Sequence, residues 1–173
     1  MIVQADKAPH WQFSLAVYGL PDVAPSCLLL QDRCGVDVNV LLLALYAAVR
    51  CKQSLDEDAI AELDTRAKAL RENVVVPLRQ VRRHMKDADY GPEAEKVRQH
   101  VKVSELKAEE LEQSLLAAWV AERPASDDPT DPQAAALLVV RHFLGLFCQS
   151  RDIEPEEETA LRHVAAAALK VAS

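Results

Sequence analysis

The chain has 173 residues, of which 50% are hydrophobic and 27% are charged, proportions that are ordinary for a globular protein with one core. Its formal net charge of −7 argues against general nucleic-acid binding, because the phosphate backbone is bound by clustered Lys and Arg. Aromatic residues make up only 5% and there are four glycines, which favours packed helices over a turn-rich β-protein. We therefore expect a single all-α domain over residues 1–173.

The first fifty residues predict three helices. A helix is expected over 9–19, because Pro is tolerated in a first turn and Gly favours a helix end. A second helix is expected over 22–34, with Asp22 as its N-cap. A third is expected over 38–52, with Asp37 as its N-cap. This third segment is apolar nearly all round, so it is predicted to be the buried centre of a bundle.

Two stretches of this region carry a family resemblance. The first reads Trp-Gln-Phe-Ser-Leu from Trp11, and the second contains Leu-Gln-Asp from Leu30 and Asp-Val-Asn from Asp37. Together they resemble the start of a family of small, all-helical bacterial proteins of unknown function. The resemblance is strongest over residues 11–46. It implies an all-helical fold, and it brings no catalytic or binding role with it.

Four polar residues lie among these apolar segments: Gln31, Asp32, Asp37 and Asn39. One interpretation is a cluster between the second and third helices that binds a cation or a polar ligand through carboxylate and amide oxygens. The alternative is local. In that case Asp37 caps a helix, Asn39 bonds to the first helical turn, and Asp32 pairs with a neighbouring cation.

The middle of the chain predicts a broken helix followed by a long one. Ser54 and Glu57 have the spacing of a capping box, which predicts the start of a fourth helix. Pro77 is expected to kink or divide this helix, because Pro removes an internal hydrogen bond. After a break at 87–91, a long helix is expected over 92–122.

The last third predicts a loop and two helices. Residues 123–131 are polar and rich in Pro, so we expect a flexible loop there before a C-terminal helix pair. Helices are expected to begin at Pro132 and Pro155, each with Pro in the first turn. The prediction is therefore a compact bundle of about seven helices with no strand.

A basic stripe lies in the middle of the chain, where residues 77–102 hold seven basic and four acidic residues. Its members have the spacing i, i+3, i+4 and i+7 on one helix face: Arg79, Arg82, Arg83 and Lys86. It predicts an anion site for phosphate groups, an acidic partner surface or RNA. The alternative is a solvated face that is balanced by an acidic one, formed by Glu105, Glu109, Glu110 and Glu112. No aromatic residues are interleaved to stack bases, which makes single-stranded nucleic acid the weakest variant.

No catalytic or metal-binding spacing is found in the sequence. It contains no Cys-x-x-Cys, no His-x-x-x-His, no Glu-x-x-His, no nucleophile elbow and no phosphate loop. We therefore predict no catalytic residue, no metal and no cofactor. The four cysteines are expected to be small buried hydrophobes in a reducing compartment.

The sequence also bears on location. No signal peptide is visible, and the longest apolar run, 40–49, is half of the roughly 20 residues that a bilayer requires. We therefore expect a cytoplasmic protein without a membrane span.

Three functional hypotheses follow from these patterns. The first is a non-catalytic protein-interaction or regulatory module, with the basic stripe docking an anionic partner protein. The second is a small-molecule or metal-binding bundle, or an enzyme, that uses Asp32, Asp37 and Asn39. The third is RNA or phosphate-group binding through the basic stripe. A homodimer is compatible with the sequence, although nothing in it requires one.

Overall fold

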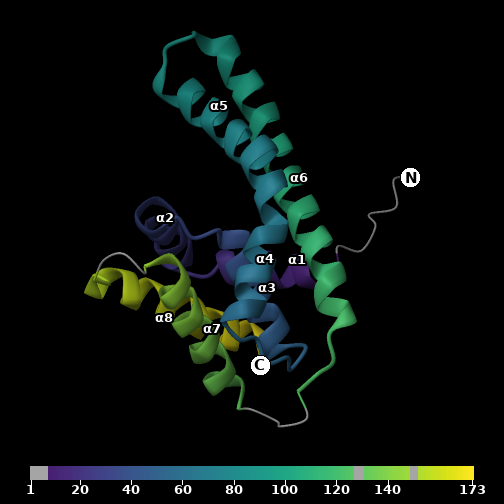
Figure 1. The fold of residues 1–173 in the computed structure, drawn as a ribbon. Helices are drawn as coiled ribbons and strands as arrows, with labels where there is room; N and C mark the ends of the chain where they lie inside the picture. Colours follow the sequence, from purple (N-terminus) through teal and green to yellow (C-terminus); the bar gives the residue numbers. More distant parts are fainter. Residues whose placement is uncertain (1–7, 127–130, 149–151) are drawn as a thin grey trace.

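The computed structural model describes residues 8–126, 131–148 and 152–173, and this part of the chain is helical and contains no strand (Figure 1). Its elements are α1 (Pro9–Tyr18), α2 (Val23–Cys34), α3 (Val38–Val49), α4 (Glu57–Leu70), the π-helical turn η1 (Arg71–Val75), α5 (Val76–Asp87), α6 (Pro92–Glu122), α7 (Pro132–Phe147) and α8 (Pro155–Ala172). Because α4, η1 and α5 follow one another without a break, the described residues form seven helical segments. The predicted all-α fold is confirmed. Residues 127–130 of the expected flexible loop lie outside the described part.

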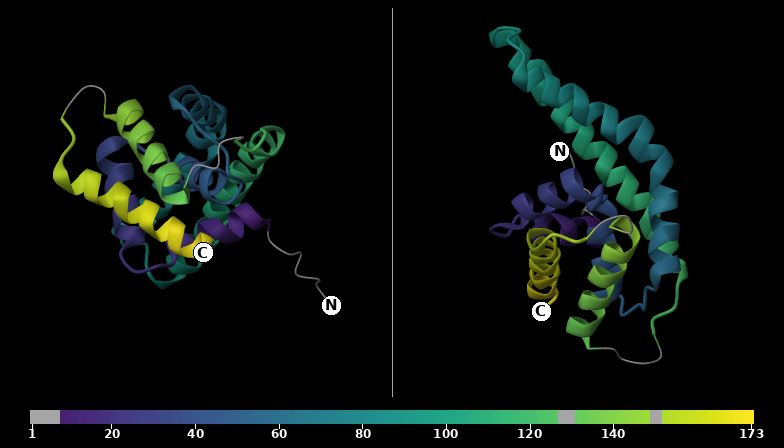
Figure 2. Two further views of the ribbon diagram at one scale, coloured as in Figure 1. Left: turned by 90° about the horizontal axis from the view of Figure 1, so that it is seen from below. Right: turned by 60° about the vertical axis from the view of Figure 1, so that its left-hand side comes forward.

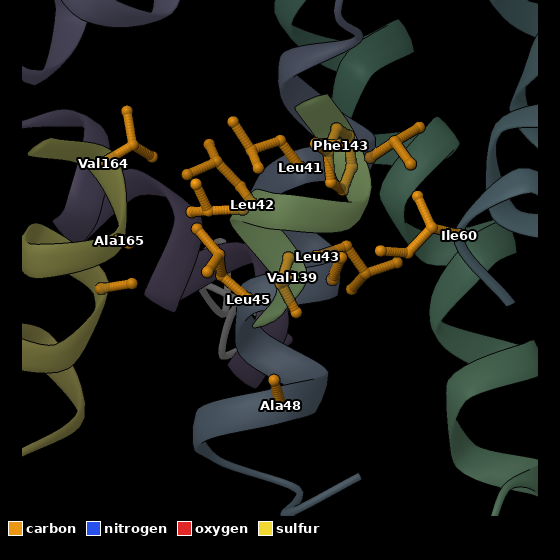
Figure 3. Packing of buried hydrophobic residues seen from close by; sticks show 14 of the residues in the cluster. Leu41, Leu42, Leu43, Leu45, Ala48, Ile60, Val139, Phe143, Val164 and Ala165 are labelled. Carbon is orange, nitrogen blue, oxygen red and sulfur yellow. The ribbon is translucent and has the colours of Figure 1, made fainter. Parts of the chain in front are cut away.

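Helix α3 is the centre of the core, as its all-round apolar pattern predicts. Ten of its twelve residues are buried. Figure 3 shows its leucines between Val139 and Phe143 of α7, Val164 of α8 and Ile60 of α4. Because helices pack around it on several sides, α3 fixes the positions of the elements that form the cleft described below.

Helix α5 and the first half of α6 form an antiparallel hairpin that extends away from this core (Figures 1 and 2). None of the residues of α5 is buried, whereas the buried residues of α6 begin only at Glu105. The second half of α6 packs against α1, α3 and α4. One long helix therefore carries the hairpin and anchors it to the core.

Pro77 does not divide the helix that contains it, and the helix has a π-helical turn just before this residue. The segment continues from Glu57 to Asp87 through the wider turn η1, which ends two residues before Pro77. In this turn the N–H of Val76 donates to the carbonyl of Arg71, one residue further back than in an α-helix. The wide turn accommodates a residue that has no N–H to donate.

Two of the predicted helix caps differ in the structure. Asp22 is at the N-cap position of α2 as predicted, but it has a φ of 63° and its side chain makes no capping hydrogen bond. The first turn of α4 is capped by Asp56, whose carboxylate accepts from the N–H of Ala59 at 2.9 Å, instead of by Ser54. Asp37 does cap α3, because its carboxylate accepts from the N–H groups of Asn39 and Val40.

Substitution of Asp56 and of Ser54 tests which of the two residues caps α4. We expect Asp56→Ala to lower the free energy of unfolding by about 1 kcal/mol, the usual cost of a lost N-cap. Ser54→Ala removes an exposed side chain with no capping role, so its effect should stay within about 0.5 kcal/mol. Urea denaturation of the two variants decides between the two caps, and equal losses would contradict the assignment to Asp56.

No single helix in the described ranges is long and apolar enough to cross a bilayer, and α1 and α2 reach that length only as a pair bent by 97°.

Candidate functional site

A cleft of about 610 Å³ lies between the hairpin and the helices α1, α2 and α3. This volume is within the range of roughly 300–1,000 Å³ that is typical of ligand-binding sites. Six of the eight predicted site residues line it: Gln31, Asn39, Arg79, Arg82, Arg83 and Lys86. Of the other two, Asp32 is bonded to a lining residue, and Asp37 lies in a polar network next to the cleft. The two patterns that the sequence shows separately therefore meet at one place.

The cleft has a largely apolar lining that comes from four helices. Its apolar members are Trp11, Leu15, Tyr18, Cys27, Leu28, Val38, Leu42 and Leu106. Three of these side chains are exposed although they are large and apolar, with Tyr18 at 38% and both Leu28 and Leu106 at 45%. They belong to α1, α2 and α6, so exposed apolar surface is present on both sides of the cleft.

Two arginines of the basic stripe are already neutralised by glutamates of α6. The Nε of Arg79 donates to Glu105 at 3.1 Å and its Nη2 to Glu109 at 2.8 Å, while Arg82 donates to both oxygens of Glu105. Burial raises the pKa of the Glu109 carboxyl, and the charge of Arg79 opposes this rise. Arg79 and Arg82 thus bind α5 to α6 and are held in fixed positions.

The remaining cations of the cleft are more accessible. Arg83 donates to Asp32 at 3.4 Å, and both side chains are about half exposed, so this ion pair is weak. Lys86 and Lys102 also line the cleft, and neither has a salt bridge to any described residue. Asp87 is the one acidic residue of α5 that lines the cleft. The positive charge that is accessible to a bound ligand therefore comes from Arg83, Lys86 and Lys102.

A buried polar network lies next to this lining, and Asp37 is at one end of it. One oxygen of Asp37 accepts from the N–H of Asn39 at 2.9 Å, and the other accepts from Nη1 of Arg71 at 3.1 Å. The same guanidinium donates to Asp64 at 2.6 Å. The start of α3 is thereby tied to η1 and α4 through charged hydrogen bonds.

Asn39 continues the network toward α6 and α1. Its Nδ2 donates to Glu112 at 2.7 Å, and its backbone carbonyl accepts from Nε2 of Gln113 at 3.3 Å. The amide oxygen of Gln113 accepts from the hydroxyl of Ser14 at 2.9 Å. Asn39 therefore joins three helices. This role is larger than the bond to its own helical turn that the local interpretation expects.

Glu112 is the most unusual member of the network. It is 1% exposed, and its Oε1 has no hydrogen-bond partner among the described residues. Burial, together with the negative charge of Asp37, raises the pKa of its carboxyl to about 8. Glu112 is therefore mostly protonated at neutral pH, where an ordinary glutamate is ionised.

Comparison with known families gives one result. Residues 9–116 match the model of a family described as a protein of unknown function (DUF2390). The chain belongs to this family. No curated protein and no solved structure matches the chain significantly. The matched range of the DUF2390 chain runs from α1 into α6 and includes every residue that lines the cleft.

Among the described residues that line the cleft of this DUF2390 protein, no hydrogen bond joins a nucleophile to a basic group. Cys27 is the only thiol among the described lining residues, and burial raises the pKa of that thiol to about 12, so the reactive thiolate is absent at neutral pH. Ser14 donates its hydroxyl proton to the amide of Gln113, which is not a base. No histidine is among the lining residues. The arrangement is suited to binding through charge and apolar contact.

The acidic stripe on α6 differs from the expected solvated face. Glu105 and Glu112 are buried, and only Glu110 makes a surface ion pair, with Lys107. The sequence does hold a signal for this, since Glu105, Glu112 and Trp119 are each seven residues apart and so lie on one helix face. That face carries the buried residues of α6.

Proposed function

We propose that this protein is a non-catalytic interaction module that binds an acidic, partly apolar segment of a partner protein in the cleft. The observation that carries the proposal is the exposure of Tyr18 and Leu28 opposite Leu106 in a cleft that also carries accessible cations. Exposed apolar side chains that border a hollow are typical of interaction sites. Aromatic residues and Arg are also enriched at the centres of protein interfaces.

The charge of the cleft supports an acidic protein segment over RNA. Five basic residues line it, but so do Asp87, Glu105 and Glu109, and the glutamates neutralise the two innermost arginines. RNA binding depends on many phosphate contacts and on aromatic stacking. A protein segment with a few carboxylates and apolar side chains requires only the three accessible cations and the apolar lining.

The proposal is tested by capture with paired variants. The tagged chain, the double variant Leu28→Asp/Leu106→Asp and the control Val103→Asp are expressed in the cells of origin, and captured proteins are quantified by mass spectrometry. Val103 is 59% exposed on α6 but does not line the cleft. We expect one protein to be captured by the wild type and the control and to be lost from the double variant.

Direct binding then completes the test. An acidic segment of the captured protein should bind purified wild type, and Leu28→Asp/Leu106→Asp should weaken binding by about 30-fold or more, the effect of losing a hot spot. Arg83→Glu/Lys86→Glu should weaken it and reduce its dependence on salt. Equal capture by all variants would overturn the proposal. A small molecule that co-purifies with the wild type and is lost from the double variant would favour a ligand-binding bundle instead.

A further inference from the structure

Three side chains with metal-binding atoms meet away from the cleft, at the ends of α2, α7 and α8. The Sγ atoms of Cys34 and Cys148 and a carboxylate oxygen of Glu157 all lie within 4.8 Å of one another. All three residues are nearly inaccessible, with Glu157 only 1% exposed. Each of these side chains can lose a proton, and the resulting thiolates and carboxylate are ligands for a metal ion.

Local structure holds each of these donors in place. Cys34 is the last residue of α2, directly before Gly35, whose φ of 68° ends the helix. Cys148 is the C-cap of α7. Glu157 lies in the first turn of α8, where one of its oxygens accepts from the N–H of Glu154 at 3.0 Å. Helix α8 packs against both α2 and α7, so the packing of the three helices itself assembles the cluster.

We propose that Cys34, Cys148 and Glu157 form a zinc site. Zinc accepts thiolate and carboxylate ligands together, with Zn–S of about 2.3 Å and Zn–O of about 2.0–2.2 Å in a tetrahedral arrangement. Donors at these distances are roughly 3.5 Å apart, so small side-chain movements bring the three atoms onto one ion. Calcium and magnesium prefer oxygen ligands alone, and iron–sulfur clusters require more cysteines than the three helix ends supply.

The ligand types in the cluster determine how zinc affinity depends on pH. Both thiols must release their protons to the solvent, so zinc affinity rises with pH. Glu157 already accepts a hydrogen bond from the N–H of Glu154, and Cys34 also takes part in an interaction. Zinc that binds the folded state adds to its stability. Three protein ligands leave the fourth position of the tetrahedron for water.

Zinc titration of purified, reduced and metal-free protein tests this proposal, with a chromophoric chelator as competitor. We expect one zinc ion per chain in the wild type and in Cys51→Ser, because Cys51 is not part of the cluster. Changes beside a metal site cost 10–100-fold in affinity, so loss of a ligand in Cys34→Ser or Cys148→Ser should weaken binding by about 100-fold or more. Glu157→Gln should also weaken it.

Cobalt gives a second readout that requires no variant. Added to the wild type, Co²⁺ should produce a thiolate-to-cobalt charge-transfer band, and zinc should remove that band by displacement. Thermal unfolding in a chelator shows whether each variant is folded before its affinity is compared. A wild type that binds neither ion, or zinc binding that survives in Cys34→Ser and Cys148→Ser, would overturn the zinc site.

Discussion

Arg71→Ala should lower the free energy of unfolding by about 3–5 kcal/mol, the typical cost of removing one partner from a buried ion pair. The side chain of Asp37 is 5% exposed, and Arg71 is the cation that bonds to it. Without this guanidinium, the carboxylate of Asp37 remains buried close to Glu112, and Asp64 also loses its ion-pair partner. The loss should appear as a lower denaturation midpoint with an unchanged slope.

Arg66 provides the matched control on the same helical segment. It pairs with Glu62 at 2.6 Å, but both side chains are about half exposed. Arg66→Ala should therefore cost no more than about 1 kcal/mol. Asp37→Asn in the Arg71→Ala background should recover part of the loss, since it removes the uncompensated charge. Equal effects of the two arginine variants would show that burial of the Asp37 pair has no energetic consequence.

The sequence predicts most of the fold because the helix boundaries are set locally. Pro at positions 9, 92, 132 and 155 begins four helices at the expected residues, since Pro fits a first turn at no cost. The burial of α3 follows from an apolar pattern that has no polar face. The sequence predicts the wrong cap for α4, because Ser54 and Asp56 are both good capping residues and only the backbone geometry distinguishes them.

The candidate site could be predicted only in parts. The basic stripe and the polar residues near α3 are visible as patterns, but their meeting depends on how the hairpin lies against α1 and α2. No rule of spacing relates Arg83 to Asp32, which are 51 positions apart. Likewise, no rule of spacing relates Cys34, Cys148 and Glu157, which come from three helices. Local rules define helices and their faces, whereas tertiary packing decides which faces form a site.

Glu112 should make the stability of this DUF2390 protein fall as pH rises from about 4.5 to about 8. Its pKa is about 8 in the folded chain against an ordinary value of 4.5, so across this window the folded state holds a proton that the unfolded state has lost. The free energy of unfolding then decreases by up to about 1.4 kcal/mol per pH unit. Above about pH 8 both states are ionised, and this contribution stops changing.

The charged groups around Glu112 agree with the sign of this effect. Burial raises the pKa of its carboxyl most, Asp37 and Glu109 add to this rise, and the hydrogen bond from Asn39 and the charge of Arg71 oppose it. Ionising Glu112 therefore places a second negative charge beside Asp37 in a buried position. This charge costs more than the hydrogen bond to Asn39 returns, because burial removes most of the solvation of both carboxylates.

Glu112→Gln tests this account, because an amide resembles the protonated carboxyl but cannot ionise. Chemical denaturation between pH 5 and 9 should show the variant losing little stability across the window, while the wild type falls progressively below it by several kcal/mol. Glu122→Gln, at an exposed residue of the same helix, should follow the wild type. Parallel curves for the wild type and Glu112→Gln would mean that Glu112 is ionised at neutral pH. The network would then have to contain a counter-charge for Glu112 beyond Arg71.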